Sequence, residues 1–190
     1  STPYREGINH SGAGRYGKIH LRTMSLYESG DSTGDISLEK LCNNEFNGKA
    51  TGEVDLKNLA KLIIRGGWPA NLGYSAKESS EAIEEYINLI IDDDLNRLDG
   101  INRDKHKVRL LLKSLARNES TTASNMTLKK DISAIDNEDV DVDTLASYLN
   151  ALDRLFLLDN DEPFSTKIRS SVRVKQSEKR HFADPSIACS

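Results

Sequence analysis

The stretch KHKVRLLLKSLARN (residues 105–118) decides the fold class. Its apolar residues recur at the spacing of one helical face, and they are Val108, Leu111, Leu112 and Leu115. A helix with such a stripe buries it against other elements. The stretch therefore predicts a core helix.

Two more helices are predicted after this one. TLKKDISAI (127–135) is typical of a short helix that Thr127 can cap, and DTLASYLNALDRL (143–155) is typical of a third helix. The side chains expected to face inward from the third helix are Leu145, Leu149 and Leu152.

Two short strands are predicted to follow, FLLDND (156–161) and SVRVKQ (171–176), around a loop that contains Pro163. Three helices and then a two-stranded ribbon is the order of a winged helix-turn-helix. We therefore expect a mainly α fold with small β elements, in which further helices precede the winged helix-turn-helix.

Three helices are predicted upstream of these. SLEKLC (37–42) predicts a short helix capped by Ser37, and a longer helix is expected from about Lys77 to Asp92. Between them, Asp55 can cap a helix that Gly66 and Gly67 end, with Leu56, Leu59, Ala60 and Ile63 at the spacing of one helical face. The helical pattern is interrupted in LNRLDGINRD (95–104), which marks a domain boundary.

Composition excludes several classes of protein. The 190 residues are 37% hydrophobic and 29% charged, which is ordinary for a globular chain with one core or two small ones, and the net charge of −4 gives no general attraction to polyanions. The four histidines and two cysteines lack ligand spacing, so no metal site is expected. Without an apolar stretch of about 20 residues, we expect no membrane span and a cytoplasmic location.

A near-match to a phosphate-binding loop occurs at HSGAGRYGKIH (10–20), where Gly12 is followed by Gly17 and Lys18. The motif needs a hydroxyl after the lysine to hold magnesium, and it needs a hydrophobic strand before it. Ile19 has no oxygen, and the residues before Gly12 are polar. We therefore interpret this segment as a glycine-rich loop that leads into a strand.

Five stretches together resemble a known family: HSGAGRYGKIHLRTMSLYESG (10–30), LIIRGGWPA (62–70), LLLKSLARNEST (110–121), YLNALDRLFLL (148–158) and IRSSVRVKQSEKRHFADPSIA (168–188). Their order and spacing are similar to those of bacterial and archaeal predicted AAA-superfamily ATPases that carry a C-terminal domain of unknown function. The resemblance covers nearly the whole chain.

The resemblance implies a division of the chain into four parts. Residues 1–30 would be the end of the AAA-type core, 31–96 the helical lid region, 97–176 the winged-helix domain, and 177–190 the start of a truncated C-terminal extension. The phosphate-binding loop would lie upstream, so the full-length protein would bind ATP and magnesium and hydrolyse ATP. The 190-residue chain alone is expected to bind neither and to be inactive.

The resemblance also implies nucleotide contacts. Arg15 is placed where such an ATPase could present a cation to a phosphate, with Arg5 as a weaker candidate, and the alternative for Arg15 is a surface ion pair. RGGWP resembles the glycine and proline element at the start of the lid, which would bring Arg65, Gly66, Gly67 and Pro69 close to the nucleotide. For Trp68 the alternative is simple burial at a helix end.

Charge bears on whether the winged helix binds DNA. Residues 136–143 hold five acids and no base at the start of the predicted recognition helix, and such an edge repels phosphate. The ribbon is basic, and its candidate contacts to nucleic acid or a partner are Lys167, Arg169, Arg173, Lys175, Lys179 and Arg180. Most basic runs are solvated faces, so nucleic-acid binding has weak support.

Two functions stay open. The first is the C-terminal part of an ATPase whose winged-helix module couples nucleotide state to a protein partner or to self-association. The alternative is a stand-alone winged-helix module for DNA binding or protein interaction, with no nucleotide role. The sequence upstream of Ser1 discriminates between them.

Overall fold

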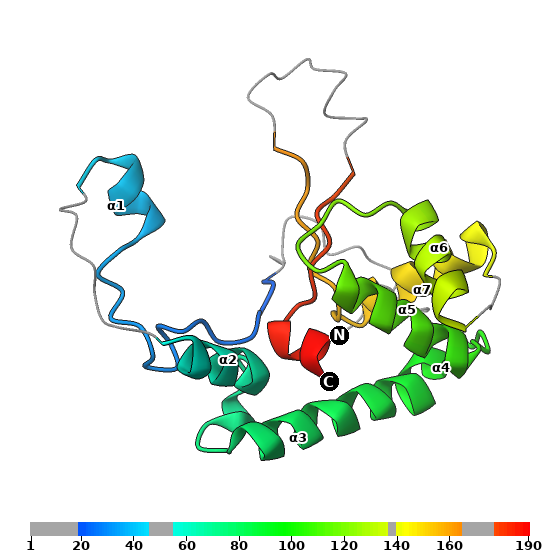
Figure 1. The fold of residues 1–190 in the computed structure, drawn as a ribbon, viewed down its shortest axis with the longest axis horizontal. Helices are drawn as coiled ribbons and strands as arrows, with labels where there is room; N and C mark the ends of the chain where they lie inside the picture. Colours follow the sequence, from blue (N-terminus) through cyan, green and yellow to red (C-terminus); the bar gives the residue numbers. More distant parts are fainter. Residues whose placement is uncertain (1–18, 46–54, 137–139, 165–176) are drawn as a thin grey trace, which may run out of the picture.

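The computed structural model describes residues 19–45, 55–136, 140–164 and 177–190, and these are mainly helical (Figure 1). The mainly α prediction is therefore confirmed. The elements in chain order are α1 (Leu38–Cys42), α2 (Leu56–Arg65), η1 (Pro69–Asn71), α3 (Ala76–Leu89), η2 (Ile90–Asp94), α4 (Leu95–Arg97), α5 (Lys105–Arg117), α6 (Asn125–Asp136), α7 (Val142–Arg154) and η3 (Pro185–Cys189).

Side-chain caps start most of these helices, as the sequence predicted for α1 and α2. Ser37 accepts a hydrogen bond from the backbone N–H of Lys40, and Asp55 accepts one from that of Asn58. The prediction for α6 was wrong in its cap. The hydroxyl of Ser124, not Thr127, lies at the helix start and accepts from the Thr127 N–H at 3.2 Å.

The long helical arm runs further than predicted. α3 continues through the π-helical turn η2 into α4, and Gly100 follows with φ +72°. The predicted end at Asp92 was wrong because Ile91 and Leu95, one turn apart, are both buried and extend the apolar stripe.

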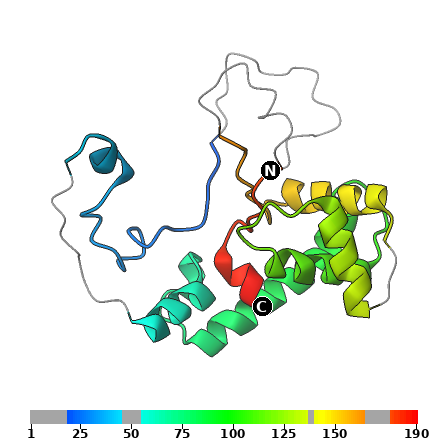
Figure 2. The same ribbon diagram turned by 45° about the horizontal axis from the view of Figure 1, so that its top comes forward.

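The core lies where α5, α6 and α7 pack together, with η2 and the C-terminal segment beside them (Figure 2). Leu111, Leu128, Leu145 and Leu152 are essentially inaccessible to solvent there. All four lie on the helical faces formed by apolar spacing in the sequence. Leu110 is also buried, whereas Leu112, which we placed on the inward face of α5, is only half-buried.

The apolar stripe that the sequence places on one face of α2 is not buried. Leu56 is 81% exposed, Leu59 42% and Ile63 36%, and α2 has no buried residue. α2 contacts α3 and η3 through another part of its circumference. Its apolar stripe therefore faces solvent over the described residues.

The first predicted strand, FLLDND (156–161), takes part in an antiparallel ribbon. Antiparallel bridges join Leu158 to Phe182 and Asp161 to Lys179. The bridges connect residues on the two sides of the boundary predicted between 97–176 and 177–190. The second predicted strand, SVRVKQ (171–176), lies outside the described residues.

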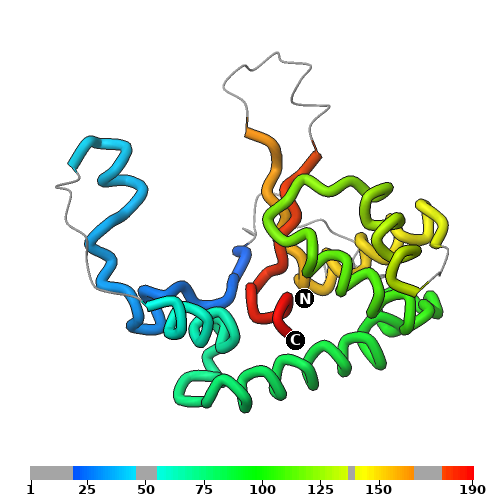
Figure 3. The backbone as a smooth tube through the Cα atoms, viewed as in Figure 1, coloured from blue at the N-terminus to red at the C-terminus, as the bar shows by residue number. Residues whose placement is uncertain are grey.

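The chain returns at its C-terminal end to the middle of the molecule. η3 packs against α2, α3 and α5, and Figure 3 shows this last segment lying between α2 and α5 alongside α3. Across the described residues, no helix is both long and apolar enough to span a bilayer. The placement of η3 brings residues 183–186 next to residues 65–68 at the end of α2.

Candidate functional site

Three segments meet at the end of α2, and we call this meeting point the junction: residues 22–24, residues 65–68 and residues 183–186. The Met24 N–H donates to the Gly67 carbonyl at 2.8 Å, and the Gly67 N–H donates to Asp184 Oδ2 at 2.8 Å. A single glycine therefore links a segment 43 positions upstream to one 117 positions downstream.

The two glycines of the junction leave no room for a side chain. Gly66 has φ +65°, and a Cβ there would collide with Asp184 Oδ1 and lie 2.6 Å from Ser186 Oγ. A Cβ on Gly67 would collide with the Met24 carbonyl and lie 2.8 Å from the Met24 nitrogen. The close backbone approach expected here does occur, but the neighbour is the chain itself.

Asp184 organises the downstream side of the junction. Its carboxylate is 1% exposed, and its Oδ1 accepts from the N–H of Ser186 at 3.0 Å and from the Ser186 hydroxyl at 2.5 Å. Asp184 is the N-cap of η3, and Pro185 occupies the first helical position. Both carboxylate oxygens of Asp184 are thus used, one for η3 and one for Gly67.

The Trp68 side chain is held by a hydrogen bond and by a ring contact. Its Nε1 donates to Ser186 Oγ at 2.9 Å, and its ring packs on Tyr86 of α3 with 5.0 Å between ring centroids. Burial, with a smaller effect of the Asp94 charge, raises the pKa of Tyr86. The half-buried indole therefore fastens the junction to α3.

Arg65 contacts the upstream segment. Its Nη2 lies 2.7 Å from Asp31 Oδ2 and 3.2 Å from Ser29 Oγ. The hydrogen bond from Arg65 is the main cause that lowers the pKa of Asp31, with the Ser29 hydroxyl next. The last carbonyl of α2, that of Arg65, accepts from the buried Asn71 side chain at 3.1 Å.

The groups that could bind phosphate at RGGWP are already engaged. Asp31 and Ser29 hold the Arg65 guanidinium, and the Asp184 carboxylate occupies the Gly67 N–H. Pro69 is exposed at the start of η1. These bonds lie within the chain and do not test the predicted nucleotide contact of Arg65, Gly66, Gly67 and Pro69, which stays a prediction.

The other predicted site residues fall into two groups. Arg5, Arg15, Lys167, Arg169, Arg173 and Lys175 lie outside the described residues. Lys179 is exposed beside its bridge to Asp161, whereas Arg180 donates to the Ala123 carbonyl at 3.2 Å and to Asn125 Oδ1 at 2.9 Å. Arg180 thus holds the start of α6, and the predicted contacts of Lys179 and Arg180 to a nucleic acid or a partner stay predictions.

A second polar cluster lies where the ribbon meets the end of α5. His181 Nδ1 is 2.7 Å from Glu119 Oε1, and Glu119 Oε2 accepts from the Phe182 N–H at 3.1 Å. His181 Nε2 lies 3.5 Å from Asp161. In the described part of the chain, no three or more His, Cys, Asp or Glu side chains are placed so that they could hold a metal ion together. The cluster therefore fastens the ribbon to the helices.

Sequence reasoning missed Asp184, Ser186, Asp31 and Asn71. The order Asp, Pro, Ser at 184–186 carries a helix-start signal, an N-cap followed by proline, that could have identified Asp184 as a cap. No signal in the sequence indicates that its other oxygen reaches Gly67, because that contact spans 117 positions.

A family model described as a domain of unknown function, DUF8612, matches residues 56–190. The chain belongs to this family. The searches of curated proteins and of solved structures returned no match to the chain. The matched region starts at the first residue of α2 and contains two of the three segments of the junction.

Proposed function

We propose that this member of the DUF8612 family is the C-terminal part of an AAA-superfamily ATPase, in which the helical domain relays nucleotide state to a protein partner. One observation carries the proposal. Three of the five stretches on which the resemblance rests supply Met24, Gly67 and Asp184, and these residues meet at the junction. The motifs thus act as one unit.

The junction is suited to coupling because residues 22–24 contact each part of the domain beside it. Thr23 Oγ1 donates to the Ala183 carbonyl at 3.4 Å, and Arg22 Nε lies 2.6 Å from Asp159 of the ribbon. The Met24 bond to Gly67 adds the end of α2. A displacement of residues 22–24 therefore has to move α2, η3 or the ribbon.

The partner on this proposal is a protein. The packing of α5, α6 and α7, followed by the antiparallel bridges, supports a winged helix-turn-helix. However, Asp141 and Asp143 lie at the start of α7, and Arg180 is committed to α6. An acidic leading helix repels a phosphate backbone, which disfavours the alternative of DNA binding.

ATP turnover by the gene product with its upstream region tests the proposal. We expect magnesium-dependent hydrolysis, a phosphate-binding loop ahead of residue 1, and no turnover by the 190-residue chain alone. Arg15→Ala should lower turnover by about 10³-fold if Arg15 stabilises the transferring phosphoryl group. Arg97→Ala, at an exposed arginine of α4, is the matched control. A gene that starts near Ser1 and yields no ATPase would support the stand-alone module instead.

Trp68 offers a second readout on the same protein. Because its indole bonds to Ser186 and packs on Tyr86, movement of the junction changes its surroundings. We expect its fluorescence to change when ATP is added to the longer protein. The 190-residue chain, which is proposed to lack the phosphate-binding loop, should show no change.

A further inference from the structure

A groove runs between α3 and α5 and ends at η3, in the region that Figure 1 shows between the two helices. Its volume is about 470 Å³, and its floor is apolar. The floor residues are Ile87, Ile91, Leu112, Ala116, Ile187 and Ala188. A cavity of this size with a mostly apolar lining is typical of a binding site.

Three cations line the same groove along α5, at intervals of four residues: Arg109, Lys113 and Arg117. Arg109 donates to the neutral side chain of Asn88 at 3.0 Å. Lys113 and Arg117 are exposed and have no hydrogen-bond or ion-pair partner among the described residues. Glu84 is the one carboxylate side chain in the described lining, so the groove is positive although the chain is negative.

The spacing of the cations discriminates between possible occupants. Residues four apart on a helix are about 6 Å apart along its axis, so Arg109 and Arg117 are separated by about 12 Å. A ligand with a single anionic head could reach only one of them. A helix with carboxylates at the same four-residue interval could face all three while its apolar side covers the floor.

We propose that this groove binds an amphipathic helix of a partner protein, with an apolar face and a row of carboxylates along one edge. This inference rests on the protein-partner part of the proposed function and names the chemistry of that partner. It does not depend on ATP turnover, because the groove is formed entirely by residues of the described chain. A negative result here therefore leaves the ATPase test unaffected.

The probe is a synthetic helix of about 14 residues, some 20 Å long, with leucines on one stripe and glutamates at four-residue intervals along its edge. A second peptide carries glutamine at the glutamate positions. Binding of both to the 190-residue chain is measured by fluorescence anisotropy at low and high salt. We expect the glutamate peptide to bind about tenfold more tightly at low salt and to lose this advantage at high salt.

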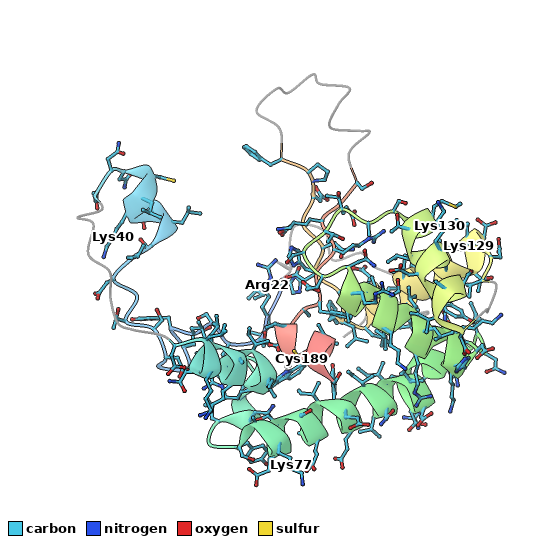
Figure 4. The ribbon with its side chains drawn as sticks, in the orientation of Figure 1. Arg22, Lys40, Lys77, Lys129, Lys130 and Cys189 are labelled. Atoms are coloured by element: carbon cyan, nitrogen blue, oxygen red, sulfur yellow. The ribbon has the colours of Figure 1, made fainter. Side chains whose placement is uncertain are left out.

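Charge reversal locates the site. Lys113→Glu combined with Arg117→Glu should weaken binding of the glutamate peptide by at least about tenfold, since two attractions become repulsions. The control combines Lys57→Glu with Lys130→Glu, which changes the net charge equally at exposed lysines of α2 and α6; Figure 4 labels Lys130 on α6. All four positions are exposed, so circular dichroism should show unchanged folding.

Several results would overturn the proposal. Equal binding of the two peptides, or an equal loss of affinity in both double variants, would show that the groove does not recognise a row of carboxylates. Displacement of the peptide by dodecanoate, but not by dodecanol, at comparable concentration would assign the groove to a single-headed amphiphile. Displacement by duplex DNA of random sequence would assign the cations to a nucleic acid.

Discussion

The segment before residue 46 and the domain after residue 55 contain helices of similar sequence character but different burial. α1 has a capping serine and leucines at helical spacing, yet it has no buried residue and Leu38 is 77% exposed. α7 also has a cap and spaced leucines, and Leu145 and Leu152 are fully buried. Local signals start both helices, whereas only packing makes one of them part of a core.

The contacts of the two regions differ in the same way. Residues 19–45 reach the domain through the polar bonds of residues 22–31 to Gly67, Asp159, Ala183 and Arg65, and through a ring contact of His20 with Phe156. The domain is held by a continuous apolar cluster. Removing the bonds of residues 22–31 should therefore detach the first region, and perturbing the core should unfold the second.

The largest effect is expected at Gly66. Gly66→Ala would combine backbone strain at φ +65° with a collision against Asp184 and Ser186, and should cost at least about 3 kcal/mol of unfolding free energy in urea. Gly73→Ala is the control, because φ is +88° there but nothing lies within 4 Å of the added Cβ. It should cost only about 1 kcal/mol. Equal losses would contradict the collision.

Two leucine truncations test the difference in burial between α7 and α1. Leu145→Ala removes a fully buried side chain and should lower the unfolding free energy by about 3 kcal/mol. Leu38→Ala should change it by less than about 0.5 kcal/mol, because the side chain is mostly in water already. Chemical denaturation of both variants measures the difference. A similar loss in both would show that α1 belongs to the core.

Asp99 makes the domain sensitive to acid. It binds the buried Arg103 guanidinium at 2.9 and 2.7 Å, and this bond is the main cause that lowers its pKa below the ordinary 3.8. Because the folded-state pKa is lowered, the ionised carboxylate stabilises the fold above about pH 4, and this contribution is lost as the pH falls further.

Asp99→Asn tests this. The variant should lose about 2 kcal/mol of unfolding free energy at pH 7 and less near pH 2. Its difference in stability from the wild type should therefore decrease as the pH falls. Asp153→Asn, at an exposed carboxylate of α7, is the control. A difference in unfolding free energy between Asp99→Asn and the wild type that stays constant from pH 7 to pH 2 would contradict a role of Asp99 ionisation.

The smallest effect is expected at Ser37. Its hydroxyl accepts from Lys40 N at 3.2 Å, so Ser37→Ala removes the cap of α1 and should reduce local helicity. Amide exchange at Lys40 should speed up, while the unfolding midpoint stays unchanged. A shifted midpoint would show that α1 folds together with the domain.

Helices were predictable where spacing and caps agree. The faces of α5 and α7 and the caps Ser37 and Asp55 follow from local chemistry, and the structure confirms them. The stripe of α2 shows the limit. Leu56, Leu59 and Ile63 have the spacing of a buried face but lie in solvent, because spacing predicts which residues share a face and not whether another element covers it.

The junction was predictable only in part. Two adjacent glycines before Trp68 and Pro69 indicate a close approach, and this is correct. The identity of the approaching group was not predictable, since Asp184 and Met24 lie far away along the chain and no local pattern encodes their meeting. In the ribbon, the described bridges pair Leu158 with Phe182 and Asp161 with Lys179, and no local pattern in the sequence indicates these partners.

The central claim is that Asp184 fixes the Gly67 turn and, through it, residues 22–24. Amide hydrogen exchange at Met24 and Gly67 tests this most directly in Asp184→Asn, which keeps the size of the side chain but turns an N–H₂ group toward one of its N–H partners. We predict exchange at least about tenfold faster at both amides, with Leu111 and Leu145 amides unchanged. Unchanged exchange at Met24 would contradict the claim.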